Sequence, residues 1–299
     1  MPATVAITVR SQFVTAADGL KLHVRLHEPP QPSGLPVFCL PGLTRTTADF
    51  DVLAHALAAN PEAPHRVIAL DSRGRGLSDY DADPANYNVA TELADLLTVL
   101  TALAIERAIF IGTSRGGILT MLLAAVNKAP IAAAVLNDIG PVIELDGLLR
   151  IKGYVGRMPA PRDYDDAARI MRTTMGPQFP RLTEADWQAS ARRTFKVIDG
   201  RLVPTYDVRL ADGLKAIEPG QPQPTLWDQF NALAGTPLMV IRGALTDLLS
   251  QATVDAMAAA HPGLEVVHVP DEGHPPLLTD APTIARIEAF IAKVEAPGR

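Results

Sequence analysis

The segment at residues 112–116, Gly-Thr-Ser-Arg-Gly, constrains the fold of this chain more than any other stretch. Residues 107–113 form an apolar run that predicts a buried strand, and residues 116–126 predict a helix. A chain that passes so abruptly from strand to helix must turn tightly, which requires small residues two positions from the serine. Such a turn exposes the Ser114 hydroxyl beside the first amides of the helix, so the segment predicts a nucleophile elbow.

Predicted strands and helices alternate along most of the chain. Residues 13–27 alternate around Asp18-Gly19, which indicates a hairpin. The further strands are short apolar runs at residues 35–40, 66–70, 131–136, 237–243 and 264–269. The further helices have helical spacing of apolar residues and lie at residues 48–60, 90–103, 251–260 and 281–294. This alternation predicts an α/β fold, with a mostly parallel central sheet and helices on both faces.

The alternation stops between residues 141 and 229. This region contains helix-like segments, scattered prolines and both tryptophans, and it shows no buried strand. Its apolar content favours a packed insertion over a disordered linker. We therefore expect a core built from residues 1–140 and 230–299, with a helical insertion at 141–229 that forms a lid over Ser114. The insertion holds aromatic residues expected in the lid core or in a substrate pocket: Tyr154, Tyr164, Trp187, Tyr206 and Trp227.

Composition excludes several classes of partner. The chain has 27 basic and 33 acidic residues with no basic tract, which argues against binding to nucleic acid or anionic membranes. Cys39 is the only cysteine, so an intrachain disulfide is impossible, and its apolar neighbours predict a packed thiol. Residues 1–10 lack the features of a signal peptide, and no apolar run is long enough for a membrane span. We expect a cytoplasmic protein; the oligomeric state is not readable from the sequence.

A serine hydroxyl is a weak nucleophile that needs a histidine base and an acid to orient that base. Among seven histidines, His274 alone lies in a loop directly after the last predicted strand. His23 and His27 belong to the first hairpin, and we interpret them as surface residues. Asp247 follows the strand at 237–243 and is favoured as the acid, while Asp138, directly after the strand at 131–136, is the alternative.

Two backbone amides are expected to stabilise the oxyanion that forms during acyl transfer. One is the amide of Arg115, directly after the serine, and the other is the amide of Leu43 in the loop that follows the strand at 35–40. The Arg115 side chain has two interpretations, namely contact with an anionic substrate group or an ion pair with an acidic residue on a neighbouring loop. The ion pair is favoured.

Together these features resemble the α/β-hydrolase superfamily, specifically its lid-bearing esterase-like members. The resemblance rests on Asp18-Gly19, Pro41-Gly42, residues 71–78, the elbow, the stretch from Arg242-Gly243 to Asp247, and Gly273-His274. It implies a serine hydrolase with a Ser114–His274–Asp247 triad, no cofactor and no metal. Serine at the elbow argues against the epoxide and haloalkane branches, which carry an aspartate there.

The expected reaction is cleavage of carboxylic esters through an acyl-enzyme. The expected substrates are small-molecule esters, oligomeric and polymeric esters included. Two alternatives stay open. One is a carbon–carbon bond or enol-lactone hydrolase that uses the same triad, in which Arg115 would face the substrate. The other is a non-catalytic ligand receptor built on the same fold.

Overall fold

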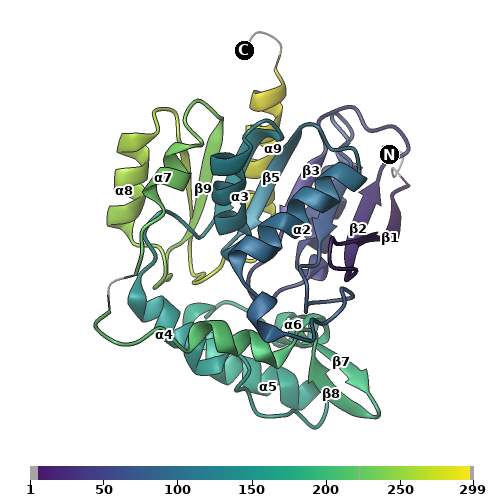
Figure 1. Ribbon diagram of the computed structural model, residues 1–299, viewed down its shortest axis with the longest axis vertical. Helices are drawn as coiled ribbons and strands as arrows, with labels where there is room; N and C mark the ends of the chain where they lie inside the picture. The colour runs from purple at the N-terminus through teal and green to yellow at the C-terminus, as the bar shows by residue number, and fades with distance from the viewer. Residues whose placement is uncertain (1–5, 222, 297–299) are drawn as a thin grey trace.

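The computed structural model describes residues 6–221 and 223–296. Residues 1–5, part of the segment considered for a signal peptide, lie outside this range. Eight strands form one sheet in the order β1-β2-β4-β3-β5-β6-β9-β10 (Figure 1). Their bounds are Thr8–Thr15, Lys21–Glu28, Val67–Leu70, Val37–Leu40, Ala108–Thr113, Ile131–Asn137, Leu238–Gly243 and Glu265–Val269, in the same order.

The sheet is mostly parallel, which confirms the predicted fold class. Only β1 and β2 run antiparallel to their neighbours, and the strands from β4 to β10 pair in parallel. Every residue of the central strands β3, β4, β5 and β6 is buried. Parallel strands covered on both faces have no water-facing side, so these sequences are continuous apolar runs. Cys39 is one of these buried residues, as the sequence predicts.

Helices cover both faces of the sheet (Figure 1). On one face, α1 (Asp51–Ala59) and α9 (Ala281–Glu295) share an apolar core with alternate side chains of the strands. On the other face, the second core cluster includes residues of four helices: α2 (Val89–Ala102), α3 (Arg115–Val126), α7 (Trp227–Asn231) and α8 (Gln251–Ala260). The two faces therefore have separate cores, as a doubly covered parallel sheet requires.

Most of the region at residues 141–229 gathers at one end of the sheet, whereas its last residues belong to α7 on the face beside α3 (Figure 1). The elements at the end of the sheet include the helices α4 (Leu145–Tyr154), α5 (Tyr164–Met175) and α6 (Glu184–Thr194). A separate small core joins Met171, Phe179, Trp187 and Phe195. The region therefore packs around its own apolar residues as well as against the sheet.

The same region contains a hairpin, β7 (Phe195–Ile198) and β8 (Arg201–Pro204), that the sequence interpretation missed. Val197 and Ile198 are exposed, so this strand has no buried apolar run to reveal it. Asp199 and Gly200 both have positive φ, 49° and 73°, which is the geometry of an Asp-Gly hairpin turn. That dipeptide was the available signal.

Within the described ranges, none of the helices combines the length and the apolar character needed to cross a membrane.

Candidate active site

The elbow forms where β5 meets α3. Ser114 has φ 50° and ψ −113°, outside the regions that a non-glycine residue usually adopts. The flanking glycines are required by close backbone approach. A Cβ on Gly116 would lie 2.0 Å from the Leu40 carbonyl oxygen, and one on Gly112 would lie 2.6 Å from backbone atoms of Gly116. The predicted strand, turn and helix are all present.

Three side chains from separate loops meet at this end of the sheet. His274 Nε2 lies 2.9 Å from Ser114 Oγ, and His274 Nδ1 lies 2.8 Å from Asp138 Oδ2. His274 and Asp138 are almost completely buried, whereas Ser114 is partly accessible. A carboxylate can only accept a hydrogen bond, so Asp138 selects the tautomer with the proton on Nδ1. Nε2 is then free to accept the serine proton.

Asp138 reaches this position because β6 lies between β5 and β9. The Ser114 amide donates to the carbonyl of Asn137, the last residue of β6, which places the serine beside Asp138. The Asp138 carboxylate also accepts from the Gly243 amide at 2.9 Å and from the Thr246 hydroxyl at 2.6 Å. These donors compensate the desolvation of a fully buried carboxylate.

The structure corrects the predicted pairing of Asp247 with His274. Asp247 instead forms a bidentate ion pair with Arg150 of α4, in which Nε lies 2.6 Å from Oδ2 and Nη2 lies 2.8 Å from Oδ1. Burial raises the Asp247 pKa, but hydrogen bonds from Arg150 and Gln178 and the positive charge of Arg150 together leave the pKa below its ordinary value. The loop after β9 thus supplies Thr246 as a donor to Asp138, and the carboxylate that contacts His274 comes from the residue directly after β6.

The loop after β3 lies directly against the elbow. The Cβ position of Gly42 is 3.6 Å from the Ser114 Cβ, and Leu43 and Arg115 line the same cavity as Ser114. The Gly42 carbonyl, which shares a peptide with the Leu43 amide, accepts from the Arg45 amide at 3.1 Å, and the Leu43 carbonyl accepts from Arg75 Nε at 2.8 Å, so both peptides of this loop are held in place. The amides of Leu43 and Arg115 therefore remain our predicted oxyanion donors.

A cavity of about 290 Å³ opens beside Ser114. Its wall is mainly aliphatic, with Ile118, Ile139, Ile143, Leu148, Ile151, Leu210, Leu214 and Leu248. None of the five aromatic residues predicted in the insertion lines it; the aromatic residue in the wall is Tyr87, which precedes α2 and which the sequence gave no reason to select. Trp187 and Tyr206 are buried in the packing of the insertion.

Arg115 is a charged residue in the wall of this cavity. Its Nε lies 2.8 Å from Glu92 Oε2, and the other oxygen of Glu92 lies 2.8 Å from Arg75 Nη1. An ion pair was the favoured interpretation of Arg115, but its partner lies on the helix α2 rather than on a loop. Burial raises the pKa of Glu92. The positive charges and hydrogen bonds of Arg75 and Arg115 together lower it by more, so the pKa lies below its ordinary value.

His23 and His27, interpreted as surface residues, are instead buried. His23 Nδ1 lies 2.7 Å from Asp71 Oδ2, and its Nε2 lies 2.8 Å from the hydroxyl of Ser11. The hairpin was predicted correctly, but this face of β2 is covered by α1, whose Asp51 lies 3.4 Å from His27 Nε2.

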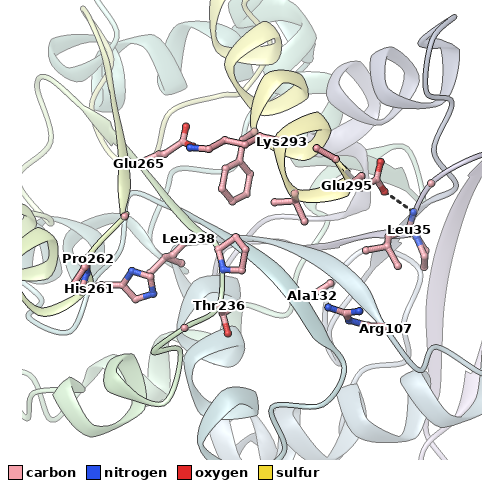
Figure 2. Close-up of a pocket in the computed structure, with 18 of the residues that line it drawn as sticks. Leu35, Arg107, Ala132, Thr236, Leu238, His261, Pro262, Glu265, Lys293 and Glu295 are labelled. Carbon is pink, nitrogen blue, oxygen red and sulfur yellow. Dashed lines mark hydrogen bonds and ion pairs between the residues drawn. The ribbon is translucent and has the colours of Figure 1, made fainter. Parts of the chain in front are cut away.

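A larger cavity of about 950 Å³ lies at the opposite end of the strands (Figure 2). The lining residues include Leu35, just before β3, Ala132, the second residue of β6, and Leu238, the first residue of β9. In Figure 2, Glu265 lies beside Lys293, and Glu295 accepts a hydrogen bond from the Leu35 amide. Ligands of open α/β sheets bind beyond the carboxyl ends of the strands. We therefore place the candidate site at the smaller cavity.

In the part of the chain that the structure describes, no cluster of three histidine, cysteine or acidic residues suits a metal ion.

The fold and site define a class that comparison with known proteins identifies directly. The model of the alpha/beta hydrolase family matches residues 37–287, so the chain belongs to this family and is a hydrolase. A 3-hydroxybutyrate-oligomer hydrolase of Cupriavidus necator is 33% identical over 290 residues, covering 94% of this chain and 97% of the relative.

Two further proteins extend this comparison. The crystal structure of an alpha/beta hydrolase from Novosphingobium aromaticivorans superposes with a TM-score of 0.88 and 42% identity, covering 95% of this chain and 98% of that one. A 2-(acetamidomethylene)succinate hydrolase of Mesorhizobium japonicum is 24% identical, covering 78% of this chain and 79% of the relative.

Proposed function

We propose that this chain is a serine hydrolase that cleaves carboxylic esters, with Ser114 as nucleophile, His274 as base and Asp138 as the orienting acid. The observation that carries the proposal is the continuous array from Ser114 Oγ to Asp138, with contacts of 2.9 and 2.8 Å, at a strained elbow beside a cavity. Membership of the alpha/beta hydrolase family and the similarity to a 3-hydroxybutyrate-oligomer hydrolase support this reaction.

In the proposed mechanism, Ser114 Oγ attacks the ester carbonyl while His274 Nε2 takes the hydroxyl proton. The Leu43 and Arg115 amides donate to the oxyanion of the tetrahedral intermediate, and Asp138 stabilises the imidazolium. When the carbon–oxygen bond breaks, His274 protonates the leaving alcohol. His274 then removes a proton from water, which attacks the acyl-enzyme and releases the acid and free Ser114.

We propose oligomeric esters of short aliphatic hydroxy acids, 3-hydroxybutyrate in particular, as the substrate class. The Cupriavidus necator relative is named for this activity and aligns along nearly its whole length. The aliphatic wall of the cavity suits short branched acyl units, and its volume of about 290 Å³ suits small ligands better than bulky lipids.

We also propose that residues 141–229 act as a lid. Leu148 and Ile151 of α4, together with Leu210, close one side of the cavity, and the Gln178 side chain accepts from the His274 amide at 3.0 Å. The insertion thus supports both the pocket wall and the loop of the base. Larger substrates would have to displace it.

A cytoplasmic location and action without nucleic acid also stay predictions, which cell fractionation and a nucleic-acid shift assay would check.

A fluorophosphonate probe tests the assignment of the nucleophile. The wild type is expected to be labelled covalently on Ser114, identified by peptide mass spectrometry, with loss of p-nitrophenyl acetate turnover. Ser114→Ala should lose the label and reduce turnover on the order of 10⁴-fold or more, because the nucleophile is removed. Ser11→Ala is the matched control and should label normally. An unlabelled wild-type protein would favour the non-catalytic receptor.

Carbon–carbon bond or enol-lactone hydrolysis is a second candidate, and the position of Arg115 in the cavity wall is the observation that favours it. A vinylogous diketo acid compared with simple esters separates the two. Turnover of the diketo acid with a higher kcat/KM than any ester would replace our proposal by this one.

A further inference from the structure

Arg115 has a buried guanidinium nitrogen with no partner, next to the proposed nucleophile. Within residues 6–221 and 223–296, its Nη2 is buried and makes no hydrogen bond, while its Nε is bound to Glu92. A buried donor left unpaired is costly, because it has lost its hydration and gained nothing in exchange. The Arg115 side chain is 20% exposed and lines the cavity, so a small reorientation of its guanidinium group would let a ligand supply the missing acceptor.

The local charge balance points to an anion. Glu92 is the carboxylate shared by two guanidinium groups, Arg75 and Arg115, which leaves an excess of one positive charge. Arg75 is fully buried, and its Nε and Nη1 donate to the carbonyls of Leu43 and Arg73 and to Glu92. Its Nη2 also has no partner among the described residues, but Arg75 does not line the cavity. Arg115 lines the cavity, so it is the member of the pair that a ligand reaches.

The surroundings strengthen this attraction. The cavity wall beside Arg115 is largely aliphatic, with Ile118 and Leu214 among its residues. A charge-assisted hydrogen bond in such a low-dielectric setting is stronger than the same bond in water. Because Arg115 directly follows Ser114, its anion would lie a short distance from the carbonyl under attack.

On the basis of the proposed function, we propose that the Arg115 guanidinium binds the free carboxylate of a hydroxy acid ester. In an oligomer of 3-hydroxybutyrate, the terminal carboxylate is separated from the last ester carbonyl by a short aliphatic spacer. Binding of that carboxylate presents the terminal ester to Ser114. The protein therefore removes one hydroxy acid at a time from the carboxyl end and prefers free acids to neutral derivatives.

The first experiment compares two substrates that differ only in charge. The dimer 3-hydroxybutyryl-3-hydroxybutyrate is ionised at pH 7.5, whereas its terminal amide is neutral and nearly the same shape. Arg115→Gln is expected to lower the ratio of kcat/KM for acid over amide about 10- to 100-fold, the range of a charged hydrogen bond. Any disturbance of the Arg115 amide affects both substrates and cancels in this ratio.

Two further variants sharpen the result. Arg115→Lys keeps the charge without the planar fork, so its ratio should lie between those of the wild type and Arg115→Gln. Arg150→Gln is the matched control, because Arg150 is similarly exposed and paired with one carboxylate but does not line the cavity. Its ratio should equal that of the wild type. An unchanged ratio in Arg115→Gln would overturn the proposal.

A binding measurement judges the site independently of catalysis. Calorimetric titration should show that sodium 3-hydroxybutyrate binds the wild type at least 10-fold more tightly than Arg115→Gln, while neutral 3-hydroxybutyramide binds both equally weakly. Equal affinity of the two proteins for the anion would refute the Arg115 site. Failure of the fluorophosphonate to label Ser114 would refute the hydrolase instead, so the two proposals fail separately.

Discussion

Ser11, His23 and Asp71 are connected in the same way as Ser114, His274 and Asp138. In both groups the serine hydroxyl lies within 2.9 Å of Nε2, and the aspartate lies within 2.8 Å of Nδ1. Both histidines and both aspartates are buried. The hydrogen-bonded connection of serine, histidine and aspartate therefore occurs twice in one chain.

The surroundings of the two serines differ. Ser114 occupies a strained turn at the start of a helix and lines a cavity. Ser11 lies within the strand β1, on extended backbone and exposed to solvent. Ser11 does not precede a helix, so no helix amide follows it as the Arg115 amide follows Ser114. Catalysis needs those oxyanion donors and a place for the substrate as well as the triad.

The two aspartates also differ in the groups that they connect. Asp71 accepts from the amides of Thr47 and Leu77, as well as from His23, and so joins β2 to two loops. Asp138 accepts from the loop after β9 and holds His274 against Ser114. The first group is best understood as a structural connection, and the second is the catalytic arrangement that we propose.

Among the variants that compare the two groups, the largest effect should come from replacing Asp138, the proposed catalytic acid. Asp138→Asn is expected to lower kcat for p-nitrophenyl acetate about 10³- to 10⁴-fold, because the amide no longer selects the tautomer that leaves Nε2 free. Asp247→Asn should change kcat less than about threefold, since it loses an ion pair with Arg150 that is partly exposed. Steady-state kinetics decides between them, and the reverse order would restore Asp247 as the acid.

The next effect concerns stability and separates the two aspartates. Asp71→Asn should lower the free energy of unfolding by about 2–4 kcal/mol, because one buried donor loses its acceptor. Urea denaturation measures this change. Activity per fluorophosphonate-titrated Ser114 should stay within about threefold of the wild type. A selective collapse of that activity, with stability intact, would show that the second group takes part in catalysis.

The smallest effect should come from Ser11→Ala. Removing one partly exposed hydrogen bond to His23 is expected to cost about 0.5–1.5 kcal/mol of stability. Turnover should remain within about twofold of the wild type. Thermal denaturation and initial rates check both values, and a loss of turnover comparable to that of Ser114→Ala would remove the distinction between the two groups.

Local sequence was sufficient for the elbow and for the general fold. Gly112, Ser114 and Gly116 act through contacts within a few residues or with the adjacent strand, so their pattern carries the geometry. The buried strands β3 to β6 are apolar at nearly every position, and that pattern requires cover on both faces.

Other features depended on partners far away in the chain. Asp138 and Asp247 both follow strands of the right kind, and only the order β5-β6-β9 places one of them beside His274. Tyr87 enters the cavity wall because of where its loop packs. The hairpin of β7 and β8 was missed because its apolar residues face solvent.

By itself, the sequence determined the sheet, the exposed serine and the histidine loop, because these follow from short-range periodicity and from the steric demands of a tight turn. The tertiary structure decided which carboxylate completes the triad and which of two similar arrays has a cavity. It also decided that one guanidinium nitrogen of Arg115 has no partner among the described residues. Those outcomes depend on which groups share a buried volume, since desolvation makes each polar atom there require a specific partner.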